Sequence, residues 1–279
     1  MKRKVIPIEH GPSHGPITRL ISPSDLGEQL KPFIFLDFFN ATIQPGFGFP
    51  MHPHSGIATL TWQPGTDVAY EDTTGQKGTL KAGGLEWMNS GGGAWHKATL
   101  LGSGKATGFQ LWVAMPPGIE NGPSQGHYIA PEEVPELVVD GGKVKVLLGA
   151  IDHASGKALS PIASHQNMNY LVVMLEANAT WSYTPPSDHD VAFAVGFSGK
   201  SAVNDVSLGG GLAVMEGSGA MEITAGDLGG QILIGSAAKH NHALVLGSSS
   251  VHTSVDALRA GISTIQAIGN ALQASGRLR

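Results

Sequence analysis

The chain has 279 residues, of which 14% are charged, and it contains 39 glycines, 17 prolines and no cysteine. This composition excludes disulfides, thiolate nucleophiles and sulfur metal ligands, and it favours short strands joined by tight turns. The formal net charge is −5 and no basic run is present, so we expect no direct binding of nucleic acid. No segment has the pattern of a membrane span or a secretory signal, so we expect a cytoplasmic protein without membrane contact.

Short runs rich in β-branched and aromatic residues, separated by turns that contain glycine, fill residues 33–115. The predicted strands cover residues 33–39, 57–62, 67–72, 78–83, 85–90 and 109–115. Between two of them, TTGQKG at 73–78 has the turn chemistry of a hairpin. This regular spacing is typical of a β-barrel or a β-sandwich.

The strand pattern stops at residues 116–135, which are rich in Pro, Gly and acidic residues, and then starts again. We therefore predict an all-β fold of two tandem barrels related by duplication, with an N-terminal domain at 1–130 and a C-terminal domain at 131–279. A terminal helix is also predicted, because apolar residues recur at separations of three and four from Leu258 to Leu272. Ser254 is its expected N-cap.

Two histidines in the segment FPMHPHSGIATLTW, at 49–62, have the spacing of a chelating pair. Side chains two residues apart on a strand point to the same face, so His52 and His54 can both point into one barrel. A useful metal site needs a third ligand. The best candidate is His96, because the three glycines of SGGGAWH allow the backbone to bend and approach closely before the strand resumes.

Three segments together resemble the N-terminal half of the pirin family. They are GFPMHPHSGIATLTW at 48–62, GTLKAGGLEWMNSGGGAWH at 78–96 and GFQLWVAMP at 108–116. The C-terminal half resembles the family more loosely, through PPSDHDVAFAV and the closing VHTSVDALRAGI. The resemblance implies a bicupin: two tandem cupin-type β-barrels, of which the N-terminal one bears the metal.

The resemblance also implies a metal site held by His52, His54 and His96. The expected ion is Fe(II), with Ni, Cu, Co, Mn and Zn as alternatives that suit imidazole ligands. A fourth family ligand, a glutamate, corresponds to Ala98, and a second acidic position of the family corresponds to Ala58. Without these carboxylates a divalent ion keeps more of its charge in a partly dry barrel and should be held more weakly.

Other polar residues are weaker site candidates. Glu71 or Glu86 could replace the missing carboxylate, although solvation at the surface is the more frequent role of such residues. His240 and His242 in HNH, and His189 in SDHDV, are expected in loops or at the surface. Trp87, Trp95 and Trp112 are expected to pack in the core or at the barrel mouth, and Trp95 adjoins His96.

Three functional hypotheses remain, of which the third is a vacant bicupin that binds an unrelated ligand in its pocket. The first is a metal-dependent dioxygenase that resembles pirins acting on quercetin-type flavonols, with a small aromatic substrate at the three histidines. The second is a non-enzymatic regulatory protein with a weakened or vacant metal site and a protein partner. This regulatory hypothesis is motivated by the alanines at positions 58 and 98, where the family has acidic residues. The general base, the substrate and the oligomeric state are not encoded in any recognisable pattern.

Overall fold

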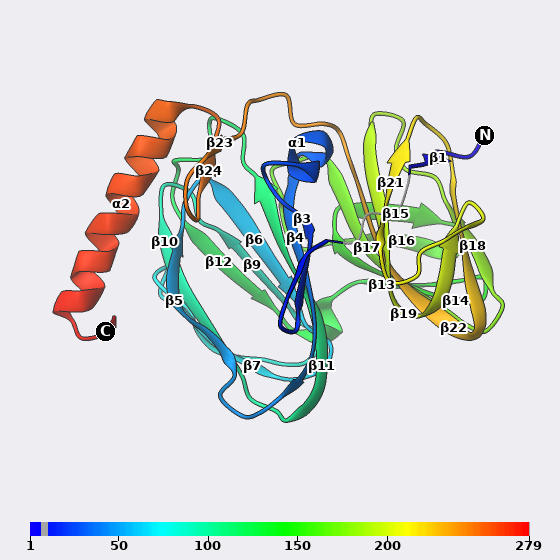
Figure 1. Cartoon of the computed structure of the whole chain (residues 1–279), viewed down its shortest axis with the longest axis horizontal. Helices are drawn as coiled ribbons and strands as arrows, with labels where there is room; N and C mark the ends of the chain where they lie inside the picture. The colour runs from blue at the N-terminus through cyan, green and yellow to red at the C-terminus, as the bar shows by residue number, and fades with distance from the viewer. Residues whose placement is uncertain (7–10, 279) are drawn as a thin grey trace. The chain divides into compact units, whose positions relative to one another are not determined.

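The computed structural model describes residues 1–6 and 11–278. The chain forms two compact units (Figure 1). Unit 1 consists of Met1–Pro12 and Val134–Lys239, and unit 2 consists of Ser13–Glu133 and His240–Arg279. Each unit is built mainly from antiparallel strands, which confirms the predicted all-β class.

In the described part of the chain, unit 2 contains two large antiparallel sheets and the two-stranded sheet of β23 (Val245–Leu246) and β24 (Val251–His252). The larger one has the strand order β12-β9-β6-β11-β4-β3-β2, with bounds β2 (Ser13–His14), β3 (Ile17–Ile21), β4 (Phe33–Ile43), β6 (Ile57–Trp62), β9 (Leu85–Asn89), β11 (Gly104–Ala114) and β12 (Gln125–Ile129). The smaller one has the order β5-β10-β7-β8, with bounds β5 (Gly48–His54), β7 (Val68–Asp72), β8 (Lys77–Leu80) and β10 (Ala94–Leu100). The predicted hairpin at 73–78 is confirmed, since β7 pairs with β8.

One face of the larger sheet carries a row of polar residues. Each is the register partner of the next, on six neighbouring strands: Arg19, Asp37, Gln110, Thr61, Glu86 and Tyr128. Residues on adjacent positions of these strands, such as Leu36, Leu60 and Trp87, are fully or almost fully buried apolar side chains of the other face. The alternation therefore places this polar row on one face of the sheet.

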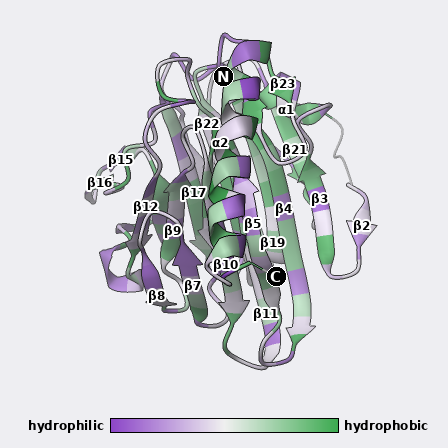
Figure 2. Ribbon diagram, turned by 90° about the vertical axis from the view of Figure 1, so that its left-hand side faces the viewer, coloured by the Kyte–Doolittle hydropathy of each residue, from purple (hydrophilic) through white to green (hydrophobic). Residues whose placement is uncertain are grey.

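The predicted terminal helix is α2 (Val255–Ala274), and its N-cap is Ser254, whose side chain accepts from Ala257 N–H. Hydrophobic and hydrophilic residues both occur along it (Figure 2). The remaining elements of unit 2 are α1 (Leu26–Leu30), the 3₁₀ turn η1 (Pro131–Glu133), β23 (Val245–Leu246) and β24 (Val251–His252). Sequence reasoning missed the short helix α1.

Unit 1 contains a larger antiparallel sheet with β13 (Glu136–Val139), β14 (Gly142–Leu148), β17 (Met168–Leu175), β22 (Met221–Ala237), β19 (Val191–Val203), β21 (Leu212–Glu216) and β1 (Lys4–Val5) in that order. Strands β18 (Thr180–Tyr183) and β20 (Val206–Ser207) pair with β22 and β19, and β15 (Ala150–His153) pairs with β16 (Gly156–Leu159). The buried core of this unit is built largely from Val, Ile, Leu and Ala on these strands.

The two units differ from the domains predicted at 1–130 and 131–279 because each end of the chain belongs to the other unit. The break after Glu133 lies close to the predicted boundary, but α2 belongs to unit 2 and Met1–Pro12 to unit 1. The helix α2 belongs to unit 2 because it contacts β10. Trp95 Nε1 donates to Ile265 O at 2.9 Å, and the indole packs on Gly269. Within the described residues no helix is long and apolar enough to cross a membrane.

Candidate metal centre

The structure brings His52, His54 and His96 together on the smaller sheet of unit 2. His52 and His96 are register partners on β5 and β10, and His54 follows two residues along β5. One ring nitrogen of each histidine lies within 4.8 Å of the others. His54 and His96 are each 4% exposed, whereas His52 is only partly buried, so the cluster is most accessible beside His52.

The glycine turn before β10 places His96. Gly91 has φ +48, and a Cβ there would lie 2.2 Å from Gly122 O. A Cβ on Gly93 would lie 2.9 Å from a methyl group of Ile265 in α2. Both positions therefore require glycine, which confirms the predicted close backbone approach.

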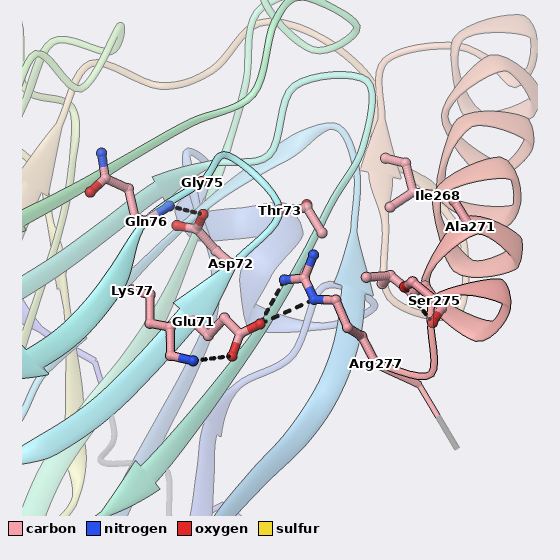
Figure 3. A pocket seen from close by; sticks show the side chains of 11 residues that line it. Glu71, Asp72, Thr73, Gly75, Gln76, Lys77, Ile268, Ala271, Ser275 and Arg277 are labelled. Carbon is pink, nitrogen blue, oxygen red and sulfur yellow. Dashed lines mark hydrogen bonds and ion pairs between the residues drawn. The ribbon is translucent and has the colours of Figure 1, made fainter.

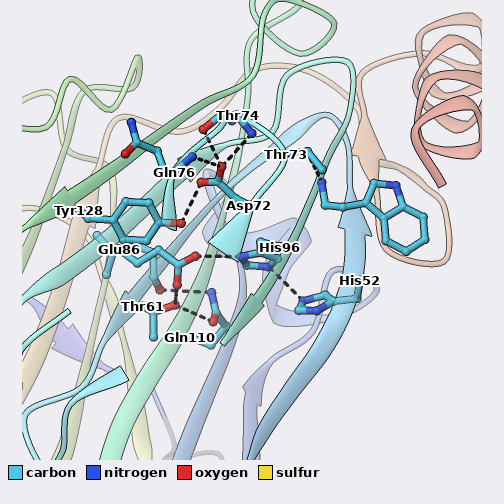
Figure 4. Close-up of polar contacts among 12 residues, drawn as sticks. His52, Thr61, Asp72, Thr73, Thr74, Gln76, Glu86, His96, Gln110 and Tyr128 are labelled. Atoms are coloured by element: carbon cyan, nitrogen blue, oxygen red, sulfur yellow. Dashed lines mark hydrogen bonds and ion pairs between the residues drawn. The ribbon is translucent and has the colours of Figure 1, made fainter. Parts of the chain in front are cut away.

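Each imidazole of the cluster has an acceptor at Nδ1. His52 Nδ1 lies 2.8 Å from Pro50 O, and His54 Nδ1 lies 2.9 Å from Ser249 O. His96 Nδ1 lies 2.8 Å from Glu86 Oε1 (Figure 4). Carbonyl and carboxylate oxygens only accept, so each Nδ1 donates its proton and each neutral ring keeps its lone pair on Nε2.

The arrangement of the Nε2 atoms fits a bound cation. Nε2 of His52 and Nε2 of His96 lie 3.0 Å apart (Figure 4). Two lone pairs facing each other at this distance repel, and a cation or a proton between them removes the repulsion. Three convergent imidazoles are the kind of donor set that borderline divalent metal ions prefer.

The protonation state of the rings is consistent with ligand behaviour. Burial, with a smaller contribution from His96, lowers the pKa of His52 to about 4. Burial also lowers the pKa of His54 well below its usual value. Both rings are therefore neutral at physiological pH, which is the form that binds metal.

Glu86 was expected at the surface, and that expectation is wrong. Its side chain is buried, with Oε1 at His96 and Oε2 accepting from Thr61 Oγ1 at 2.9 Å. Burial raises the pKa of Glu86, but the electrostatic interaction with His96 and the hydrogen bonds from His96 and Thr61 outweigh burial and lower the pKa below its usual value. Sequence reasoning could have noticed that Glu86 and Thr61 share the alternation of neighbouring strands.

A cavity of about 370 Å³ has Phe35 and Trp112 among its lining residues. The three histidines do not line it, and Trp112 is the lining residue that contacts one of them. Trp112 stands edge-on to His54 with ring centroids 5.0 Å apart, and its face stacks on Phe35 at 4.2 Å. The guanidinium of Arg19 lies over the Phe35 ring, 3.9 Å from its centroid, and forms an ion pair with Asp37. The opposite wall is the segment 246–251, whose Ser249 carbonyl holds His54.

Several buried polar residues hold this C-terminal segment against the end of β5, the strand that carries His52 and His54. Ser55 Oγ donates to Ser250 Oγ at 2.8 Å and lies 3.0 Å from His252 Nε2. Glu120 accepts from the backbone N–H and the hydroxyl of Thr253. These contacts position the Ser249 carbonyl, and no side-chain pattern in the sequence indicated them.

A second cavity of unit 2, of about 460 Å³, lies between the β7–β8 hairpin and the end of α2 (Figure 3). At its edge Glu71 binds Arg277, Lys77 and Lys97, and these cations lower its pKa to about 2. Glu71 is thus held by ion pairs and does not hydrogen-bond to the histidine cluster in the described structure.

The other candidate residues lie as follows. His189 is buried, contrary to expectation, and bonds to Ser236 and Asn167. His240 is also buried, whereas His242 is exposed as expected. Trp87 is in the core and Trp112 is at the cavity, as predicted.

Comparisons with known proteins agree with this picture. Residues 16–113 match the family model described as Pirin. A Pseudomonas aeruginosa protein named "Putative quercetin 2,3-dioxygenase" is 33% identical over 185 residues, which is 64% of each protein, so the chain covers just under two thirds of that relative.

Two solved structures share the fold. Quercetin 2,3-dioxygenase from Acinetobacter baumannii superposes with a TM-score of 0.85 at 22% identity, covering 94% of this chain and 96% of that one. The pirin YhhW from Escherichia coli in complex with nickel(II) has a TM-score of 0.62 at 20% identity, covering 85% and 98%. With these likenesses the predicted bicupin architecture is confirmed.

Proposed function

We propose that this chain, which carries a domain of the pirin family at residues 16–113, is a metal-dependent dioxygenase of small flavonol-type aromatic substrates. Its metal ligands are His52, His54 and His96, and Fe(II) is the proposed ion. The observation that carries the proposal is the Nδ1 hydrogen bond made by each ring, which directs three Nε2 lone pairs to one place. The names of its relatives supply the reaction class.

The chemistry that a divalent ion supplies at this position is Lewis acidity, which makes a coordinated substrate hydroxyl more acidic. The protein's own residues bind and orient. Trp112 lines the cavity, where it stacks on Phe35 and stands edge-on to His54, and the partial exposure of His52 leaves access to the cluster. The cavity of about 370 Å³ is in the range of small-molecule sites.

The regulatory alternative was motivated by the loss of both carboxylates, at Ala58 and Ala98. Buried Glu86 weakens that motive, because a carboxylate does contact the histidine cluster. We therefore favour the enzymatic function.

The test is aerobic turnover of a flavonol by protein loaded in turn with iron, copper, nickel, cobalt and manganese. We expect flavonol loss and oxygen uptake above the rate of the same free metal, and loss of this activity in His52→Ala. An exposed histidine of the same unit, His127, supplies the matched control variant His127→Ala. No flavonol loss above free metal with any of the five ions would refute the proposal.

A further inference from the structure

We propose that Glu86 is a positioning residue that supplies the negative charge missing from the three-histidine site and acts through His96. The inference rests on the proposed function, since it requires that the cluster hold a metal ion. In other metal sites a carboxylate ligand brings this charge directly. Here a buried carboxylate that does not bind the metal itself would bring it.

The geometry places Glu86 behind the metal-facing nitrogen. Its Oε1 accepts from His96 Nδ1 at 2.8 Å, while Nε2 on the other side of the same ring faces His52 (Figure 4). The imidazole therefore lies between the carboxylate and the cluster of Nε2 atoms. Thr61 holds the second carboxylate oxygen at 2.9 Å, which keeps Glu86 in this position and away from direct ligation.

The other carboxylates near the site form hydrogen bonds or ion pairs with groups outside the histidine cluster. Asp72, the register partner of His96 on β7, accepts from Thr74 and Gln76 through Oδ1 and from the Tyr128 hydroxyl through Oδ2. Glu71 is held by cations. At position 98, two residues beyond His96 on β10, the side chain is the methyl group of Ala98.

The charges explain why such a group is needed. Three neutral imidazoles leave a divalent ion with its full +2 charge, and His54 and His96 are buried. A carboxylate bonded to Nδ1 fixes the tautomer, orients the ring and increases the basicity of Nε2. Removal of such a partner weakens metal affinity by about 10- to 100-fold in proteins that use it.

The experiment measures Co(II) affinity by calorimetry, together with the Co(II) d–d spectrum, in wild type and Glu86→Gln. Glutamine keeps an oxygen that can accept from His96 but removes the charge, so the variant isolates the electrostatic part. We expect affinity to fall by about 10- to 100-fold and the d–d bands to shift, because His96 becomes a weaker donor. The matched control Glu71→Gln, which removes a carboxylate of the same unit, should leave both measurements unchanged.

A rescue tests the charge directly. Ala98 lies on the same strand face as His96, so Ala98→Glu places a carboxylate beside the cluster. The double variant Glu86→Gln, Ala98→Glu should bind Co(II) at least tenfold more tightly than Glu86→Gln alone. If Glu86→Gln only disturbed the fold, the added carboxylate would not restore affinity. If Glu86→Gln does not fold, Glu86→Asp takes its place, because the shorter side chain withdraws the carboxylate from His96 Nδ1 and should lower affinity several-fold.

Two outcomes overturn the inference and are distinguishable. If wild type binds Co(II) and Glu86→Gln, or Glu86→Asp in its place, binds within about twofold of it, Glu86 has no such role and the proposed function stands. If wild type itself binds no Co(II), the inference falls, and the proposed function is decided by the turnover test with the five ions.

Discussion

Nε2 of His52 lies 3.0 Å from Nε2 of His96 across the paired strands β5 and β10. Both rings already donate from Nδ1, to a backbone carbonyl and to Glu86. The two neutral rings therefore turn their lone pairs toward each other, which is unfavourable unless a positive charge lies between them. A shared proton or a bound metal ion supplies that charge, and the metal content of the purified protein distinguishes the two.

Replacing Phe35 by leucine should weaken flavonol binding without removing the metal. The variant keeps an apolar side chain but leaves Trp112 without the ring that fixes its orientation in the cavity wall. Loss of one aromatic contact between Trp112 and the flavonol, about 1 kcal/mol, is roughly fivefold in the dissociation constant. Fluorescence quenching by the flavonol measures the affinity, and elemental analysis checks the metal. Unchanged affinity would mean that the substrate does not occupy this cavity.

Alanine at position 91 should destabilise the protein by about 2 kcal/mol or more. The added Cβ would lie 2.2 Å from Gly122 O, and φ is +48. The control is Gly75→Ala, where φ is also positive but no atom lies within 4 Å, so only the backbone strain of about 1 kcal/mol applies. Urea unfolding measures both, and equal losses would contradict the role of the close approach.

The stability of the metal-free protein should fall as the pH drops from about 6.5 to 4, partly because of His240. Burial, followed by the neighbouring His242, lowers the pKa of His240 to about 4 from the usual 6.5. The unfolded chain then binds more protons than the folded one in this range, so the stability is complete above pH 6.5 and is lost toward pH 4.

His240→Asn should remove on the order of 2 kcal/mol from that pH-dependent loss. The exposed His14 provides the control His14→Asn, which should leave the pH profile of unfolding unchanged. A His240→Asn profile parallel to that of wild type would show that another group carries the effect.

Local patterns in the sequence predicted much of this structure. The alternation of β5 and the glycines before β10 indicated the three histidines, because both features act within a few residues. The apolar stripe and the Ser254 cap likewise indicated α2.

Contacts between distant segments could not be predicted in the same way. Glu86 and His189 were expected to be solvated because charged and polar residues usually are, yet each is buried by partners from other strands. The carbonyl of Ser249 reaches His54 from 195 residues away, and a backbone group leaves no side-chain pattern to recognise.

The most direct test of the account is the metal content of protein purified without a histidine tag, for wild type and His52→Ala. His52 suits this test because it is only partly buried and its Nδ1 partner is a backbone carbonyl, so its removal should not unfold the protein. We predict about one divalent transition ion per wild-type chain, strongly reduced metal in His52→Ala and unchanged metal in the control His127→Ala. A wild-type protein without metal, or a His52→Ala variant that retains it in full, would contradict the central claim.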